Sequence, residues 1–189
     1  MAQINGLHVK KLKKFAGHDG EPCFQGDLYL GKTKIAFWSQ DGHGAIEDNV
    51  VMEDGLSDII LDKQISALNQ DKIRRGISMS GKPWELEYGL TQLMSDYLIL
   101  TEDEKLFKRA TKKGYSAILI ITDDFHLTYY SLPANYLAFT DEQLKEKMKI
   151  QIAEASKQMF KNQEVKVKIY RSLDDFIIGT PIELDSIKR

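Results

Sequence analysis

The segment FQGDLYLGKTKIAFW, residues 24–38, decides the fold class of this chain. In its two runs, FQGDLYL and KIAFW, large apolar residues recur at every second position, as half-buried strands require. Gly31 lies in the short connection between the runs, and a short connection with glycine is typical of a β-hairpin. The segment therefore predicts two antiparallel strands joined by a tight turn.

The flanking sequence extends this hairpin into a meander and adds a second group of strands. Residues 8–15 (HVKKLKKF) predict a strand before the hairpin, and residues 45–52 predict a short strand after it. The run YSAILIIT, residues 115–122, is continuously apolar, which predicts a strand buried on both faces. Further strands are predicted at residues 126–132 and 164–170.

Helical spacing of apolar residues separates these two groups of strands. Helices are predicted at residues 56–68, 83–97, 101–114 and 141–161, with a short one at 172–178. Thr101 with Glu104 and Thr140 with Gln143 have the spacing of a capping box, which predicts a helix start at each threonine.

The order of these elements predicts the architecture. Because strands and helices are grouped and do not alternate one by one, an α+β fold with a mostly antiparallel sheet is favoured over a doubly wound parallel sheet. We expect a single domain over residues 1–189, with an N-terminal β-meander and about four helices. Residues 69–82, rich in glycine, serine and charge, are predicted to be a loop, as a boundary or a mobile segment.

Composition excludes several classes of protein. The 189 residues carry 26 Lys+Arg and 28 Asp+Glu, a net charge of -2, which is typical of an ordinary globular chain. The single cysteine, Cys23, excludes an intramolecular disulfide and a multi-cysteine zinc site, and we expect it to pack as a small, partly buried side chain at the start of a strand. No apolar run is long enough for a signal peptide or a membrane span, so a cytoplasmic protein without membrane contact is expected.

Two glycine-rich turns form the first candidate site. GHDG at residues 17–20 and DGHG at residues 41–44 each carry a histidine. If the meander brings both turns to one end of the sheet, the imidazoles and nearby carboxylates could bind zinc or manganese, or act as acid and base. The candidate residues are His18, Asp19, Asp41, His43, Glu47 and Asp48. The alternative is that these residues serve only the backbone geometry of the turns.

Basic segments form the other candidates. A diffuse anion site is predicted in the loop, at Lys72, Arg74 and Arg75. The stretches Lys10, Lys11, Lys13, Lys14 and Lys166, Lys168, Arg171, each with a neighbouring aromatic residue, allow a nucleic-acid surface. Lysines that protect exposed strand edges are the alternative interpretation. No Walker or Rossmann glycine motif is present, and no cofactor is predicted.

The stretch FAGHDGEPCFQGDLYLGKTKIAFWSQDGHG, Phe15 to Gly44, resembles the start of a group of small uncharacterised proteins of Gram-positive bacteria and their phages. The shared pattern is a short turn, a strand like DLYL, then G-K-x-K, an aromatic-rich strand and a second glycine-rich turn. The resemblance implies a cytoplasmic protein in a phage or mobile-element context, and it implies no particular activity.

These observations favour a non-enzymatic binding module of bacterial or phage origin that sequesters a protein partner or a small anionic ligand. The first alternative is a small metal-assisted hydrolase or nuclease that uses the two histidine-containing turns. The second alternative is a nucleic-acid binder that uses the lysine-rich strands.

Overall fold

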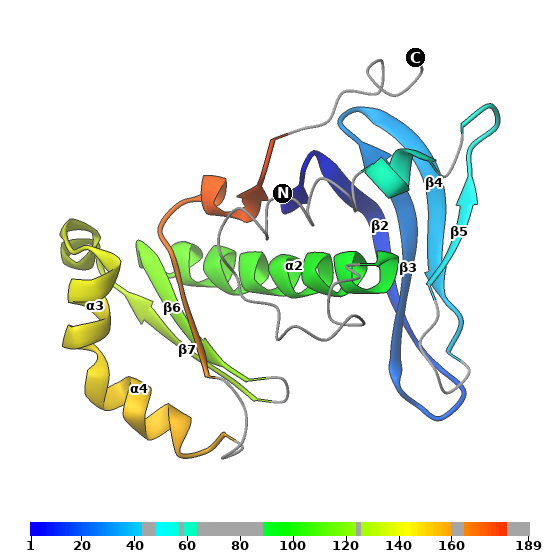
Figure 1. The fold of residues 1–189 in the computed structure, drawn as a ribbon. Helices are drawn as coiled ribbons and strands as arrows, with labels where there is room; N and C mark the ends of the chain where they lie inside the picture. Colours follow the sequence, from blue (N-terminus) through cyan, green and yellow to red (C-terminus); the bar gives the residue numbers. More distant parts are fainter. Residues whose placement is uncertain (43–47, 57–58, 64–88, 124–125, 160–164, 181–189) are drawn as a thin grey trace, which may run out of the picture. The chain divides into compact units, whose positions relative to one another are not determined.

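A computed structural model gives the fold of the chain (Figure 1) and describes residues 1–42, 48–56, 59–63, 89–123, 126–159 and 165–180. The chain divides into two compact units. The first, which we call the β-rich unit, comprises Ala2–Ile99 with Ile177–Arg189, and the second, the α/β unit, comprises Met1 with Leu100–Phe176. Helix α2, Leu90–Lys112, contributes residues 90–99 to the β-rich unit and residues 100–112 to the α/β unit.

The β-rich unit contains a six-stranded sheet in the order β5-β4-β3-β2-β1-β9. The strands are β1 (Gln3–Ile4), β2 (Leu7–Ala16), β3 (Pro22–Leu30), β4 (Thr33–Gln40), β5 (Asp48–Met52) and β9 (Ile177–Ile178). Every described neighbour pair is antiparallel except β1 with β9, which run parallel. The predicted N-terminal meander is therefore confirmed.

The two faces of this sheet differ in character. The inner face carries the buried apolar residues Leu7, Val9, Leu28, Ala36 and Trp38. The outer face carries the residues that alternate with them, which are mostly charged or aromatic. The described residues of α2 in this unit add Leu93 and Met94 to the buried set. The alternation expected for half-buried strands thus sorts the meander into a core side and a solvent side.

Tyr97 on α2 forms hydrogen bonds with backbone groups of β2 at the edge where the short strand β1 has ended. Its hydroxyl accepts a hydrogen bond from the Val9 N–H at 2.9 Å and donates to the Val9 carbonyl at 3.3 Å. Figure 1 shows the N-terminal half of α2 next to β2 and β3. A buried side chain therefore replaces the strand that would otherwise continue this edge.

His8 on β2 makes the stability of the β-rich unit depend on pH. Its side chain is buried, with the ring stacked on Tyr29 at a centroid distance of 5.6 Å. Burial lowers the pKa of His8 below its ordinary value of 6.5, the Gly6 carbonyl opposes this shift, and the charge of Lys10 adds to it. The unfolded chain therefore binds a proton more readily than the folded chain as the pH falls below 6.5.

We expect the free energy of unfolding to be undiminished by His8 above pH 6.5, and to fall as the pH decreases from there towards the lowered pKa of the folded state. Urea unfolding at about pH 7.5 and about pH 5 measures the difference, and His8→Gln should make it smaller. An equal difference in the wild type and in His8→Gln would contradict this assignment.

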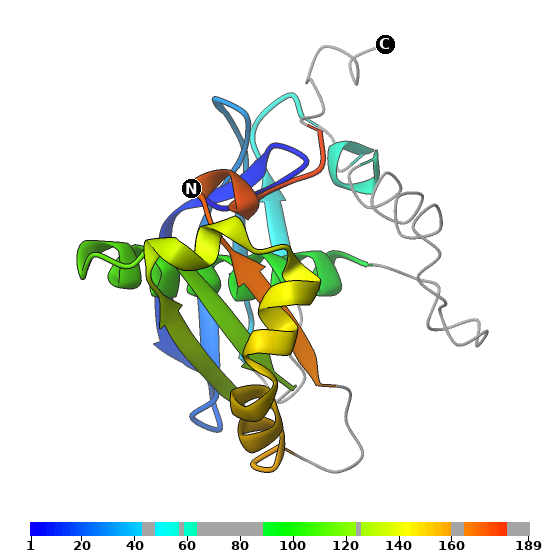
Figure 2. The same ribbon diagram turned by 90° about the vertical axis from the view of Figure 1, so that its left-hand side faces the viewer.

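The α/β unit contains a three-stranded antiparallel sheet in the order β7-β6-β8. Its strands are β6 (Ala117–Thr122), β7 (Leu127–Leu132) and β8 (Lys166–Tyr170). Residues 117–121 of the central strand β6 are all buried, which agrees with the predicted burial on both faces. Helices α3 (Asp141–Lys147) and α4 (Lys149–Ser156) lie in front of this sheet in Figure 2. The unit also contains the short 3₁₀ helices η2 (Ala134–Ala138) and η3 (Leu173–Phe176).

The core between α3, α4 and the sheet explains one correction. Residues 141–161 were predicted to form one helix, but the described part is broken at Met148, whose φ of -99° and ψ of 11° lie outside the helical range. The break accompanies the burial of Leu144, Met148 and Ala155 in one cluster with Leu119 and Ile121. The start of the first helix was predicted correctly, because Thr140 and Gln143 form the capping box.

A second correction concerns α2. Two helices were predicted, with a start at Thr101, but α2 runs through this position without interruption to Lys112. Buried residues continue at helical spacing on both sides of Thr101, from Tyr97 to Phe107. Burying this continuous stripe favours one helix, and the capping-box spacing at Thr101 is coincidental.

The remaining predictions have mixed outcomes. The helix end at Gly114 is confirmed by its positive φ of 87°. The short C-terminal helix is the 3₁₀ helix η3, and it is followed by β9. Residues 59–63 are helical, whereas the rest of the predicted helix after residue 63 and the loop at 69–82 lie outside the described residues. The α+β class with about four helices is confirmed in the described parts of the chain, and a single domain over 1–189 stays a prediction. No helix among the described residues is long and apolar enough to cross a membrane.

Candidate functional site

A bulge in β2 shapes the outer face of the β-rich unit. Lys10 pairs with Asp27 and Lys13 pairs with Gln25, so two residues of β2 lie opposite Gly26 alone. In a regular strand, Lys10 and Lys13 would point to opposite faces, because side chains alternate. The bulge places both on the outer face, since Asp27 and Gln25 share that face.

Lys11 occupies the bulge in a left-handed backbone conformation, with a φ of 54°. This conformation is unfavourable for a residue with a Cβ atom. The Lys11 side chain nevertheless joins the outer face, where its Nζ lies 2.9 Å from Asp27 Oδ2. Three lysines from four consecutive positions thus lie on one face of one strand.

Asp27 forms ion pairs with Lys11 and with Lys34 on the neighbouring strand β4. Its Oδ1 lies 3.1 Å from Lys34 Nζ, which also lies 2.7 Å from Glu53 Oε1. Hydrogen bonds from Lys11 and Lys34 lower the pKa of Asp27, and the bond to Asp27 raises the pKa of Lys11. The carboxylate therefore stays ionised and the lysines stay protonated at neutral pH.

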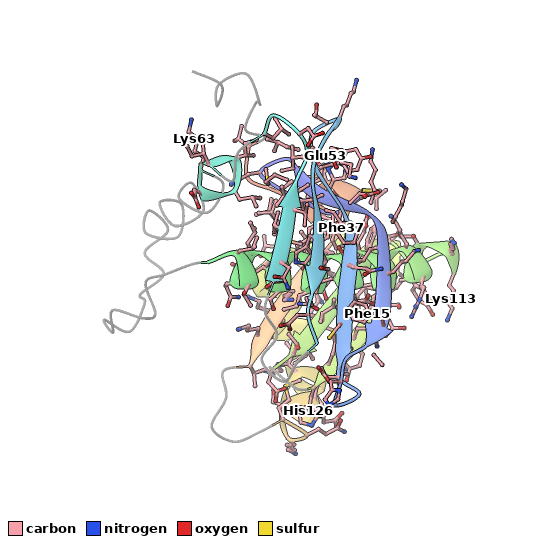
Figure 3. The ribbon with its side chains drawn as sticks, turned by 90° about the vertical axis from the view of Figure 1, so that its right-hand side faces the viewer. Phe15, Phe37, Glu53, Lys63, Lys113 and His126 are labelled. Carbon is pink, nitrogen blue, oxygen red and sulfur yellow. The ribbon has the colours of Figure 1, made fainter. Side chains whose placement is uncertain are left out.

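A small cavity of about 170 Å³ lies on this face. It is lined by Lys11, Lys13, Gln25, Gly26, Asp27 and Phe37. The Phe37 side chain is 37% exposed, and Val51, its partner on β5, is 67% exposed. Figure 3 shows Phe37 on this face of the sheet, with Phe15 further along it. The cavity combines an apolar wall with cations, which suits an anion that carries an apolar part.

The lysines around this cavity differ in whether they already have a partner within the chain. Lys11 and Lys34 are paired with Asp27, and Lys10 Nζ lies 3.9 Å from the centroid of the Tyr29 ring. Among the described residues, Lys13 has no carboxylate within ion-pair distance. Lys13 is therefore the cation of this group that is best placed to bind an external anion.

The described parts of the two glycine-rich turns, residues 17–20 and 41–42, meet at one end of the same sheet. The His18 N–H donates a hydrogen bond to the Gly42 carbonyl at 2.7 Å. A Cβ atom at Gly42, whose φ is 67°, would lie 2.8 Å from Gly17 Cα. The backbone of the first turn is therefore in contact with Gly42, whereas residues 43 and 44 of the second turn lie outside the described residues.

The side chains of these turns do not form a described metal site. His18 and Asp19 are exposed, and Glu21 Oε2 accepts a hydrogen bond from the Asp19 N–H at 2.9 Å. Asp48 Oδ1 accepts a hydrogen bond from the Trp38 indole at 2.6 Å, which gives Asp48 a structural role. The described part of the chain contains no group of three or more His, Cys, Asp or Glu that could hold a metal ion. Half-buried Asp41 precedes Gly42, while His43 and Glu47 lie outside that part, so the metal site stays a prediction.

Cys23 lies beside these turns and is buried. Burial raises the pKa of its thiol, and the negative charges of Glu21 and Asp41 raise it further. The thiol is therefore protonated at neutral pH, and it is a poor nucleophile. This environment agrees with the expectation that Cys23 packs and does not react.

Two of the three cations of the second basic stretch, Lys168 and Arg171, make internal contacts in the α/β unit. Lys168 Nζ and the Tyr170 hydroxyl lie 2.9 and 2.8 Å from the same atom, Asp103 Oδ2. Arg171 bonds to the Asp141 carboxylate and to the Phe139 carbonyl. Because Tyr170 is also buried, this stretch does not present the open, stacking surface that nucleic-acid binding would need. Lys72, Arg74 and Arg75 lie outside the described residues.

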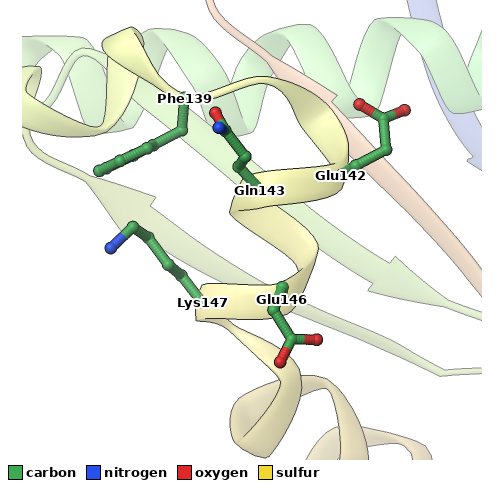
Figure 4. A pocket seen from close by; sticks show the side chains of 5 residues that line it. All are labelled: Phe139, Glu142, Gln143, Glu146 and Lys147. Carbon is green, nitrogen blue, oxygen red and sulfur yellow. The ribbon is translucent and has the colours of Figure 1, made fainter.

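The α/β unit has a wider hollow of about 460 Å³ beside α3 (Figure 4). It is lined by Phe139, Glu142, Gln143, Glu146 and Lys147. Lys147 Nζ lies 4.3 Å from the centroid of the Phe139 ring, so the chain's own cation already occupies the aromatic face. Figure 4 shows the two glutamate side chains directed away from Phe139. This hollow therefore lacks the convergent polar groups of a binding site.

Comparison with known proteins found no family model that matches the chain, no similar curated protein and no similar solved structure. The resemblance of residues 15–44 to small proteins of Gram-positive bacteria and their phages therefore stays a prediction.

Proposed function

We propose that this protein is a non-enzymatic binding module that holds a small anionic ligand on the outer face of the β-rich unit. The observation that supports the proposal is the β2 bulge, which gathers Lys10, Lys11 and Lys13 on one face beside Phe37. A strained left-handed residue is costly, and such residues occur more often where a binding surface needs them. A cytoplasmic location, which suits a free cysteine, and a bacterial or phage origin, which the resemblance of residues 15–44 implies, belong to the same proposal.

The size and chemistry of the cavity favour a small ligand. A cavity of about 170 Å³ is smaller than typical sites for drug-sized molecules, so it suits a phosphate or carboxylate group with a short apolar part. The anion would contact Lys13, with Lys11 beside it, while the apolar part would contact Phe37. Asp27 would keep Lys11 and Lys34 in position without neutralising Lys13.

Titration calorimetry with phenyl phosphate tests the proposal. A charge-assisted hydrogen bond contributes about 1.5–3 kcal/mol, so Lys13→Ala should weaken phenyl phosphate binding about tenfold or more. The matched control is Lys14→Ala, which removes the same charge from the next residue, whose partner Phe24 lies on the other face of β3. Lys14→Ala should change the affinity less than about twofold, because Lys14 can act on the ligand only through a long-range charge interaction, which salt screens.

The comparison of probes separates the possible outcomes. Phenyl phosphate should bind more tightly than inorganic phosphate, because only phenyl phosphate contacts Phe37. Equal losses in Lys13→Ala and Lys14→Ala would show a diffuse charge effect and would contradict a site at the bulge. If neither phosphate binds but a single-stranded oligonucleotide does, with an affinity that falls steeply with salt, the nucleic-acid alternative would replace this proposal.

A further inference from the structure

Among the described residues, one edge of β7 in the α/β unit has no partner strand, and its sequence suits pairing with another strand. β7 is the outermost strand of its sheet, and its only described neighbour is β6. Natural edge strands are usually protected by charges, prolines, bulges or short length. β7 has the sequence LTYYSL, without a charge or a proline, and its six residues pair with β6 without a register shift.

The opposite edge of the same sheet shows the expected protection. β8 carries the exposed Lys166 and the half-buried Lys168. On β7, by contrast, the large side chains of Leu127 and Tyr129 are 48% and 39% exposed on one face. Uncharged Thr and Tyr residues favour strand pairing, so an open β7 edge is unusual unless a partner strand covers it.

The hairpin register identifies the backbone groups that point outward from this edge. The Asp123 N–H donates to the His126 carbonyl at 3.1 Å, which makes these two residues the closing hydrogen-bonded pair. Hydrogen-bonded pairs alternate along an antiparallel ladder, so residues 128, 130 and 132 bond to β6. The N–H and C=O groups of Leu127, Tyr129 and Ser131 therefore point away from β6.

We propose that β7 pairs antiparallel with β7 of a second copy of this chain, around a two-fold axis at Tyr129. In this register Tyr129 lies opposite Tyr129 of the second copy, and Leu127 lies opposite Ser131. All the outward groups of both strands then find partners, because opposite residues in a hydrogen-bonded pair exchange both bonds. Registers centred on other residues leave some outward groups unpaired or place Pro133, which has no N–H, in the ladder.

A second copy fits this edge because the pairing is self-complementary. A two-fold axis perpendicular to the sheet keeps each face on the same side, so the exposed face of Leu127 and Tyr129 meets its own equivalent. No charged side chain lies opposite another in this register, since β7 contains none. The two three-stranded sheets would join into one continuous sheet. This inference concerns the α/β unit and is independent of the ligand proposed for the β-rich unit.

Charge substitution at the two-fold position tests the pairing and its register. The wild type should show a mass of twice 21.6 kDa by light scattering as its concentration is raised, in reversible equilibrium with the monomer. Tyr129→Lys and Tyr129→Glu should each be monomeric, because like charges would lie directly opposite each other. A mixture of the two variants should recover a heterodimer, because opposite charges then meet at the axis.

The matched control is Ile150→Lys, which places a lysine at another exposed apolar position of the same unit, 64% exposed on α4. Ile150→Lys should dimerise like the wild type, and circular dichroism should show all variants folded. A wild type that stays at 21.6 kDa at every concentration would overturn the proposal. A dimer that persists in Tyr129→Lys, or a mixture that remains monomeric, would overturn the pairing at Tyr129.

Discussion

Replacing Asp103 with alanine is expected to destabilise the protein by about 3 kcal/mol, because it leaves the buried Tyr170 hydroxyl without its acceptor and the half-buried Lys168 ammonium without its ion-pair partner. Asp103 is 1% exposed, and its Oδ2 accepts hydrogen bonds from Lys168 Nζ and from the Tyr170 hydroxyl. Burial, followed by the charge of Asp103, raises the pKa of Tyr170 far above its ordinary value. The phenol therefore stays protonated and loses its acceptor in Asp103→Ala.

Urea unfolding compares Asp103→Ala with Glu102→Ala, a substitution at the adjacent residue. Glu102 makes an exposed ion pair with Lys105 at 2.6 Å, and such pairs contribute about 0–1 kcal/mol. The double variant Asp103→Ala with Lys168→Met should recover part of the lost stability, because it removes the unpaired charge. If Asp103→Ala cost no more than Glu102→Ala, the cluster would not be a determinant of stability.

The Asp103 cluster also shows why the sequence alone could not assign a role to the second basic stretch. Lys166, Lys168 and Arg171 form a basic stretch in the sequence, but the carboxylates that bind two of them come from distant segments. Asp103 lies 65 positions before Lys168, and Asp141 lies 30 positions before Arg171. Strand periodicity predicts which residues share a face, and it does not predict which distant charges meet them.

Local patterns predicted the fold well where the determining contacts are local. The meander at residues 24–38, the buried strand β6 and the capping box at Thr140 depend on neighbours a few positions away. The same capping-box spacing at Thr101 failed, because the tertiary burial of α2 outweighs one local hydrogen bond. The two-residue strands β1 and β9 pair the two ends of the chain, and no local pattern marks strands this short.

The candidate site was only partly accessible from the sequence. The run HVKKLKKF was identified as basic, but it places lysines in adjacent pairs, and a regular strand cannot keep adjacent residues on one face. This departure from the two-residue period of a strand is the feature of the sequence that could have predicted a bulge at Lys11. Phe37, Asp27 and Lys34 come to the site from β3 and β4, so their involvement depends on the cross-strand register. The sequence alone leaves that register open.

Replacing Trp38 with alanine is the second large expected effect, about 3–5 kcal/mol for a fully buried aromatic residue. Trp38 is 0% exposed on the inner face of β4, and its indole donates the hydrogen bond to Asp48 that joins β4 to the start of β5. Trp38→Ala leaves a cavity in the β-rich unit and removes the donor from Asp48 Oδ1. Trp38→Phe keeps most of the volume but loses the donor, so its cost should be smaller, about 1–3 kcal/mol.

Phe37→Ala provides the matched control, because residues 37 and 38 are neighbours on opposite faces of one strand. The partly exposed Phe37 should contribute little to stability, within about 0.5–1 kcal/mol, while its loss should weaken phenyl phosphate binding. Trp38→Phe should have the opposite effects. Its free energy of unfolding, measured in urea, should be lower, while its affinity for phenyl phosphate, measured without urea, should be unchanged. If Phe37→Ala destabilised the protein as much as Trp38→Ala, the outer face would be part of the core. The lysines gathered there by the bulge would then have a structural role, because a face that is needed for packing is not available to a ligand.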